Sequence, residues 1–143
     1  MPPAKRVKAF TLIEVLISIL ILGILISIAV PNYNLYTDRA KFSEVVLASA
    51  LYKNAVEMVY LTGRSKVFSE FDGGHLGIPN NDSDQVLPNQ FISKATVIDG
   101  VITIESNIIR DGKGVTLVLT PVASENGTLS WRVSGTCVDA GLC

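Results

Sequence analysis

The sequence predicts an α+β fold in which a long N-terminal helix packs, by its C-terminal half, on an antiparallel sheet of about four strands. Apolar residues recur at helical spacing from about Phe10 to Thr62. After residue 95 the spacing changes to two, and turn signals separate short alternating stretches. A helix of that length measures roughly 80 Å at 1.5 Å per residue, too long for a chain of 143 residues to bury along its whole length. Its hydrophobic half is therefore expected to protrude into a membrane or against another chain.

The first nine residues are basic and contain no acidic side chain, as expected of a leader over 1–9 rather than of folded structure. They carry Lys5, Arg6 and Lys8, three of the twelve basic residues. Their removal leaves nine basic residues against thirteen acidic ones, a formal net charge of −4 in place of −1. Because a basic flank keeps the N-terminus in the cytoplasm, the C-terminal part is expected on the exported side.

Residues 10–31 form an apolar segment long enough to span the hydrocarbon core of a bilayer as a helix. The segment contains a single charged side chain, Glu14, and ends at Pro31. A carboxylate in such a segment costs on the order of 2.5–3.5 kcal/mol on insertion scales, and is a functional residue by default. A position near the membrane surface, where Glu14 is simply hydrated, is the alternative. The small residue Ala29 also leaves open a conventional signal peptide that is cut after the apolar run.

Two residues weaken this helix toward its end. Gly23 is about 1 kcal/mol less favourable than alanine in a helix. Pro31 removes a backbone hydrogen bond and clashes with the preceding turn, at about 3 kcal/mol. The helix is therefore expected to bend or to melt between these two residues, and a static kink is the alternative.

Beyond Pro31 the pattern becomes amphipathic, and a globular domain is expected over 32–143, with its helix reaching about residue 62. Gly63 is a suitable residue to end that helix, since glycine is favoured just beyond a helix C-terminus. The residues whose spacing predicts packing include Tyr33, Tyr36, Phe42, Val45, Val46, Tyr52, Val56, Val59 and Tyr60.

Residues 63–94 carry repeated turn signals, such as Asp72-Gly73-Gly74, and predict a long loop with little regular structure. A loop of this length within a compact domain is usually functional. His75 and the carboxylates of Asp82 and Asp84 lie in it, but they form no clear series of metal ligands. We expect no metal and no cofactor.

The sheet is expected within 95–134, with strands at 95–98, 101–105, 115–120 and 129–134. Asp99-Gly100 is a strong signal for a two-residue hairpin turn between the first two strands. Alternation places Val115, Leu117 and Leu119 on one face of the third strand, and Leu129, Trp131 and Val133 on one face of the fourth. This apolar face is expected to pack on the helix.

Both cysteines, Cys137 and Cys143, lie in the C-terminal tail 137–143. On the exported side of a membrane they are expected to form a disulfide, and two free thiols are the alternative. No serine, cysteine or carboxylate constellation in the sequence indicates catalysis, so the chain is not expected to be an enzyme.

The stretch Ala9-Phe10-Thr11-Leu12-Ile13-Glu14-Val15-Leu16 resembles the cleavage motif of type IV pilin precursors, and Pro31 also fits that pattern. Gly77-Ile78-Pro79, the hairpin 97–104, and Trp131 ahead of two late cysteines look like major type IVa pilins of Gram-negative bacteria. The resemblance covers nearly the whole chain and implies the pilin fold.

The resemblance also implies a site and its partners. A prepilin peptidase would cut between Ala9 and Phe10, and the new N-terminus of Phe10 would be methylated. Glu14 would then pair with the α-amino group of Phe10, in the same or a neighbouring subunit, and set the register of assembly. The segment from Gly23 to Pro31 would loosen in the filament. The other implied partners are further copies in a helical homopolymer, the inner-membrane assembly machinery, the membrane before assembly, and nucleic acid only through pilus-mediated DNA uptake.

By the same resemblance the precursor would sit in the inner membrane, with a cytoplasmic N-terminus and a periplasmic domain, before assembly into a cell-surface pilus. That pilus would serve adhesion, twitching motility, biofilm formation or DNA uptake. Two features depart from the family pattern. Ala9 stands where glycine is usual, so slower cleavage is expected, and the ring between Cys137 and Cys143 is shorter than in many relatives.

Three other functions remain open on the sequence. A minor pilin or a type II secretion pseudopilin would share the N-terminal motif. A single-pass membrane protein with a periplasmic binding domain would need no cleavage at Ala9. An enzyme with a signal anchor has no candidate site in this sequence.

Overall fold

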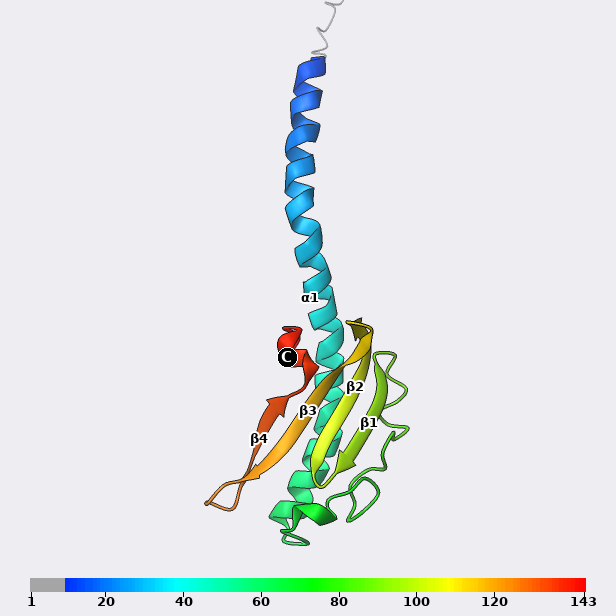
Figure 1. The fold of residues 1–143 in the computed structure, drawn as a ribbon, viewed down its shortest axis with the longest axis vertical. Helices are drawn as coiled ribbons and strands as arrows, with labels where there is room; N and C mark the ends of the chain where they lie inside the picture. The colour runs from blue at the N-terminus through cyan, green and yellow to red at the C-terminus, as the bar shows by residue number, and fades with distance from the viewer. Residues whose placement is uncertain (1–9) are drawn as a thin grey trace, which may run out of the picture. The chain divides into compact units, whose positions relative to one another are not determined.

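The computed structural model describes residues 10–143, with the backbone alone at Pro31 and Asn32, and has the expected α+β architecture. Figure 1 shows a long helix and a sheet, and the sheet has four strands. The elements are α1 (Leu12–Leu61), the 3-10 turn η1 (Phe68–Glu70), β1 (Ile92–Ile98), β2 (Val101–Arg110), β3 (Lys113–Ala123), β4 (Leu129–Ser134) and α2 (Thr136–Asp139). The chain divides between Tyr36 and Thr37 into two compact units, and each is described here by itself.

The first unit is the apolar part of α1. Every large apolar side chain from Leu12 to Val30 is at least half exposed. By length and composition, α1 is a helix that is able to cross a membrane. Tyr33 and Tyr36 are 70% and 67% exposed, so the prediction that they pack within the chain is wrong. Their helical spacing continues that of the core residues, but they precede Phe42, the first of the described residues of α1 to be fully buried.

The second unit packs the sheet on the remainder of α1. The sheet has the order β1-β2-β3-β4, and all neighbouring strands are antiparallel. Figure 1 shows it lying along this part of the helix. The buried helix residues are Phe42, Val45, Ser49, Tyr52, Val56, Val59 and Tyr60. They face buried residues of the sheet, among them Val97, Ile102 and Ile104. Val115, Leu117 and Leu119, which alternation had placed on one face, are buried there as well.

In the second unit, a further helix residue predicted to pack is exposed, while a serine is buried. Val46 is 43% exposed, whereas Ser49 is 3% exposed. The buried row runs through Val45, Ser49 and Tyr52, so Val46 lies on the flank of the helix. The Ser49 hydroxyl donates to the Val46 carbonyl at 2.6 Å, which satisfies its polar group inside the core.

The first hairpin turn forms at Asp99-Gly100, as the sequence predicted, and a second turn of the same kind forms at Asp111-Gly112. Asp99 and Gly100 have φ values of 51° and 77°, and Asp111 and Gly112 have values of 50° and 74°. Two consecutive residues with positive φ are the requirement of a type I′ turn, which matches the twist of the flanking strands. β4 runs from Leu129 to Ser134 as predicted.

Three strands are longer than their patterns indicated. β1 begins at Ile92 rather than at residue 95, and the register shifts between Ile92 and Lys94. β2 continues to Arg110 beyond a second shift that follows Glu105. Each irregularity interrupts the period of two, so the pattern ended before the strand did. β3 extends from Lys113 to Ala123, beyond the predicted end at residue 120. Pro121 had favoured that earlier end, because proline cannot donate a hydrogen bond to a neighbouring strand.

The long loop is held against the outer edge of β1 by side chains that act like a neighbouring strand. Asn81 Oδ1 accepts a hydrogen bond from the Val97 amide at 2.8 Å, and Asp82 Oδ1 accepts one from the Ala95 amide at 2.8 Å. The Asp82 amide donates to the Ala95 carbonyl at 2.7 Å. These bonds occupy backbone groups that an edge strand otherwise exposes to other chains.

Candidate assembly site on the N-terminal helix

The start of α1 carries the two residues that the sequence predicted for assembly. Phe10 precedes the helix and is 77% exposed. Glu14 lies in the first turn, where a negative charge is favoured by the helix dipole. Ser18 donates to the Glu14 carbonyl at 2.7 Å, so its hydroxyl is satisfied within the helix. The structure leaves Phe10 and Glu14 accessible to a partner.

Thr11 caps this helix, a role that the sequence reasoning missed. Its carbonyl accepts from the Glu14 amide at 3.1 Å, and its hydroxyl accepts weakly from the same amide at 3.4 Å. Thr11-x-x-Glu14 is also the sequence of a capping box, and this spacing was the signal available to find it. A complete capping box would give the Glu14 side chain a use at the helix start besides the predicted role in register.

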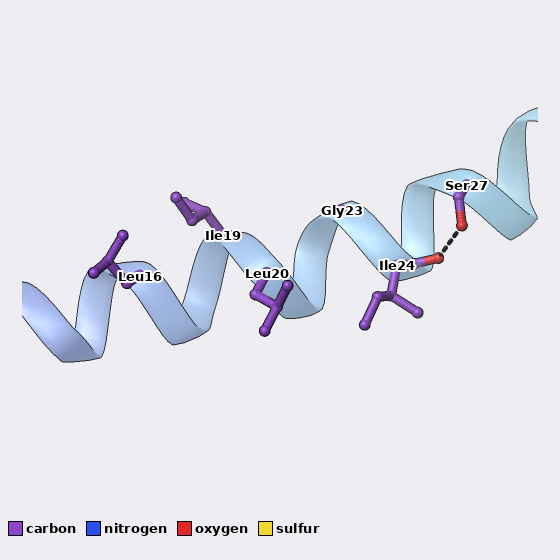
Figure 2. Close-up of a pocket in the computed structure, with 6 residues that line it drawn as sticks. All are labelled: Leu16, Ile19, Leu20, Gly23, Ile24 and Ser27. Carbon is purple, nitrogen blue, oxygen red and sulfur yellow. Dashed lines mark hydrogen bonds between the residues drawn. The ribbon is translucent and has the colours of Figure 1, made fainter.

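One face of the apolar helix has a shallow hollow of about 620 Å³ (Figure 2). Leu16, Leu20 and Ile24 rise around Gly23, where an added Cβ would meet nothing within 4 Å. Ser27 keeps its hydroxyl against its own helix by donating to the Ile24 carbonyl at 2.7 Å, the dashed line in Figure 2. Small residues four positions apart let another helix approach closely in a membrane.

The structure does not test the residues predicted for cleavage and for loosening of the helix. Ala9 lies outside the described residues. The backbone of α1 is helical at both Gly23 and Pro31. A bend or a melted segment between these two residues therefore stays a prediction for the filament.

The tail forms a small cross-linked unit around α2. Cys137 and Cys143 are joined by a disulfide, with Cα atoms 5.3 Å apart, and Cys137 is fully buried. Arg39 of α1 donates through Nε to the Gly141 carbonyl at 2.7 Å. On the other side, the Thr136 hydroxyl accepts from the amide of Thr116 in β3 at 2.9 Å. The tail is therefore attached to both the helix and the sheet.

Asp82 and His75 of the loop have structural partners. Asp82 accepts the Ala95 amide, as described above, and His75 Nδ1 donates to the Glu70 carbonyl at 2.9 Å. Within residues 10–143, no group of three or more histidine, cysteine, aspartate or glutamate side chains is arranged to hold a metal ion.

Comparison with known proteins gives two kinds of match. Residues 4–30 match a family model described as the prokaryotic N-terminal methylation motif. The chain is 34% identical over 127 residues to a fimbrial protein of Neisseria meningitidis serogroup B, covering 87% of this chain and 71% of the relative. The chain belongs to the type IV pilin family. This pilin is also 33% identical over 127 residues to the type IV major pilin protein PilE1 of Neisseria gonorrhoeae, covering 87% and 73%.

A more distant relative widens the range of organisms. The pilin is 29% identical over 125 residues to the prepilin peptidase-dependent protein D of Escherichia coli, an alignment that covers 87% of this chain and 80% of that protein. These alignments extend well beyond the N-terminal motif. The resemblance on which the sequence assignment rested is therefore confirmed for the sheet domain as well as for the helix.

Proposed function

We propose that this pilin is the structural subunit of a type IV pilus, cut between Ala9 and Phe10 and polymerised through its N-terminal helix. The observation that carries the proposal is the exposed apolar surface of residues 12–30, where every large side chain is at least half exposed, in a chain of this family. The match to the methylation motif supports N-methylation of Phe10. A relative named for its dependence on prepilin peptidase supports the cleavage.

The apolar helix gives the subunit two stable environments. In the membrane, lipid covers the side chains from Leu12 to Val30. In a filament, the same side chains would contact other copies of the helix. Because lipid tails are as apolar as leucine, the transfer changes little in hydrophobic burial, and close packing decides the preference. The hollow at Gly23 and Ser27 is one place where such packing is favoured.

Glu14 supplies a positional signal within this apolar surface. In a bundle of helices its carboxylate would be removed from water, and an unpaired buried charge is strongly unfavourable. The α-amino group of Phe10, freed by cleavage, is a cation of the right sign close to the helix start. Pairing between Glu14 of one subunit and Phe10 of the same or another subunit would fix the axial position of each arriving helix.

Replacing Glu14 by glutamine tests this pairing against the capping role. Glutamine keeps the capping-box pattern but carries no charge. We expect Glu14→Gln to be processed normally. It should yield about tenfold fewer filaments in sheared surface material, because a loss of about 1.4 kcal/mol of assembly free energy changes the equilibrium tenfold. Normal filament yield with Glu14→Gln, together with reduced yield for Glu14→Ala, would show that Glu14 acts only as a cap.

The cellular setting follows from the same proposal. The precursor and the subunit pool would lie in the inner membrane, with the N-terminus in the cytoplasm and the sheet domain in the periplasm. Assembly machinery in that membrane would move subunits into the pilus. Adhesion, twitching motility, biofilm formation and pilus-mediated DNA uptake are the activities that such a filament serves.

The nearest alternative within the family is a minor pilin or a secretion pseudopilin. The relatives named as major pilins favour a major pilin here. The abundance of the chain in sheared filaments distinguishes the two, because a major pilin is the predominant protein of that fraction.

A further inference from the structure

Two tyrosines follow the apolar segment of α1 and take no part in the folded core. Tyr33 and Tyr36 are 70% and 67% exposed. They are three positions apart in α1, so both rings lie on one face of the helix. Both belong to the same compact unit as the apolar segment. We call these two residues the tyrosine pair.

The chemistry of the tyrosine pair suits a boundary between lipid and water. Tyrosine combines an apolar ring with a polar hydroxyl group, so one end of the side chain prefers acyl chains and the other prefers water. For this reason tyrosine is enriched where membrane helices pass through the headgroup region. Two large rings exposed directly after an apolar helix segment therefore indicate contact with such a boundary.

The distance along α1 places the tyrosine pair at that boundary. Roughly 28 Å of helix separates Glu14 from Tyr33 at 1.5 Å per residue. The hydrocarbon core of a bilayer is about 30 Å thick. A helix that keeps the Glu14 carboxylate at one membrane surface therefore has Tyr33 at the other. Tyr36 lies about 4.5 Å further along the helix, within the depth of the headgroup region.

The charges in the sequence agree with this placement. Between Glu14 and Asp38 the sequence contains no charged side chain, and Arg39 follows Asp38 directly. Charged side chains are costly among acyl chains, so the membrane surface falls before Asp38. The tyrosine pair thus occupies the short stretch between the last apolar residues and the first charges.

We propose that the tyrosine pair, Tyr33 and Tyr36, anchors the subunit to phospholipid where the headgroups meet the acyl chains, in the leaflet on the exported side. The inference rests on the proposed membrane-held subunit pool and names residues that set its depth. The proposed cleavage would remove Lys5, Arg6 and Lys8, the basic anchors of the opposite surface. The tyrosine pair stays in the processed chain and would fix the depth from which each subunit enters the filament.

Fluorine NMR of the full chain in phospholipid nanodiscs shows where the rings lie. meta-Fluorotyrosine is incorporated at all four tyrosines, and Tyr33→Phe and Tyr36→Phe assign the two signals of the pair. Tyr52 and Tyr60, which are buried in the globular unit, are internal controls. The discs consist of phosphatidylcholine and phosphatidylglycerol, and they contain lipids spin-labelled either near the headgroup or near the end of the acyl chain.

We expect the label near the headgroup to abolish the signals of Tyr33 and Tyr36, and the label near the chain end to leave them. Neither label should affect Tyr52 or Tyr60. Loss of the pair's signals only with the chain-end label would place the rings in the membrane interior. Loss only with a water-soluble gadolinium chelate would place them in water, and protection from all three agents would show that another copy covers them. Each of these three results would overturn the anchor.

The same sample separates this inference from the proposed function. If the chain enters the discs and the headgroup label spares the tyrosine pair, only the anchor is wrong. If the chain does not enter the discs at all, the membrane-held subunit of the proposed function fails.

A thicker bilayer distinguishes an anchor from rings that merely reach the boundary. A helix held by an interfacial anchor is accommodated by local thinning of the bilayer, whereas unanchored rings sink among the acyl chains. In discs of longer-chain lipid we expect the headgroup label still to abolish the Tyr36 signal, both in the unchanged chain and in Tyr33→Trp, which keeps an amphipathic ring. In Tyr33→Leu, which loses that ring, the chain-end label should abolish it instead. If Tyr33→Leu responds like Tyr33→Trp, Tyr33 is not an anchor.

Discussion

Tyr52 fixes the long loop to the helix through a single buried hydroxyl group. Its Oη donates to the Asn80 carbonyl at 2.9 Å and accepts from the Ser83 amide at 3.3 Å. Burial of the side chain raises the pKa of Tyr52 above its ordinary value of 10.0, and the nearby Asp82 carboxylate raises it further. The hydrogen bond from the Ser83 amide lowers the pKa, but its effect is smaller than that of burial.

We therefore predict that Tyr52→Phe lowers the free energy of unfolding by about 1–3 kcal/mol, because two backbone groups lose their partner. The full chain in detergent is unfolded with urea and followed by the fluorescence of Trp131, the single tryptophan. Tyr36→Phe, at an exposed tyrosine, is the matched control and should change stability by less than about 0.5 kcal/mol.

The same pair of proteins tests the effect of pH. Because the pKa of Tyr52 is raised on folding, the folded state favours the neutral hydroxyl. Its contribution to stability is complete below pH 10.0 and decreases as the pH rises above that value. The difference in unfolding free energy between the unchanged chain and Tyr52→Phe should thus shrink above pH 10.0. A difference that stays constant up to pH 11 would contradict the assignment of the raised pKa to this hydroxyl.

At the scale of elements, the C-terminal tail depends on its cross-link. α2 has a single turn, and its ring is closed by the disulfide between Cys137 and Cys143. By loop entropy a ring of this size stabilises the folded chain by about 2 kcal/mol. The ring also keeps Gly141 in place to accept the hydrogen bond of Arg39.

We predict that reduction of this disulfide lowers the urea midpoint of the full chain by an amount equivalent to about 2 kcal/mol. Unfolding is measured with and without reductant, and mass spectrometry establishes that both thiols are free. The double variant Cys137→Ser, Cys143→Ser is the control, because reductant should not change its midpoint. An unchanged midpoint after complete reduction of the natural chain would show that the ring does not stabilise the fold.

Local signals in the sequence were sufficient for the elements that they specify directly. The helical period predicted α1, and Asp99-Gly100 predicted the first hairpin turn, because the period and the turn chemistry are both properties of neighbouring residues. The start of β1 and the burial of Ser49 were not predictable in this way. They depend on a shift in pairing with β2 and on which row of α1 the sheet covers, and these are contacts between distant residues.

The functional residues likewise divide into those that a local motif identifies and those that depend on distant contacts. Phe10 and Glu14 were identified from a short motif, and the structure adds that both lie at an accessible, capped helix start. The exposure of Val133 could not be predicted, since the alternation of Trp131 and Val133 indicates only which face they share. How far that face lies from the helix is determined by the three-dimensional course of the sheet.

At the scale of the whole molecule, the central claim is that the chain is cut, modified, cross-linked and exported as a filament subunit. Each unit contributes one part of that claim. The unit that ends at Tyr36 offers an exposed apolar helix for assembly. The unit that begins at Thr37 is a folded domain with its own core and a disulfide in its tail.

The intact mass of the protein from sheared cell-surface material, with and without reductant, tests this claim most directly. We predict a chain that starts at Phe10, is heavier by one CH2 because a methyl group replaces a hydrogen on its α-amino nitrogen, and is lighter by two hydrogens before reduction. That mass would show cleavage after Ala9, methylation, the disulfide and surface export in one measurement. A mass that starts at Met1, found only in the membrane fraction, would contradict the account and favour a membrane-anchored periplasmic domain.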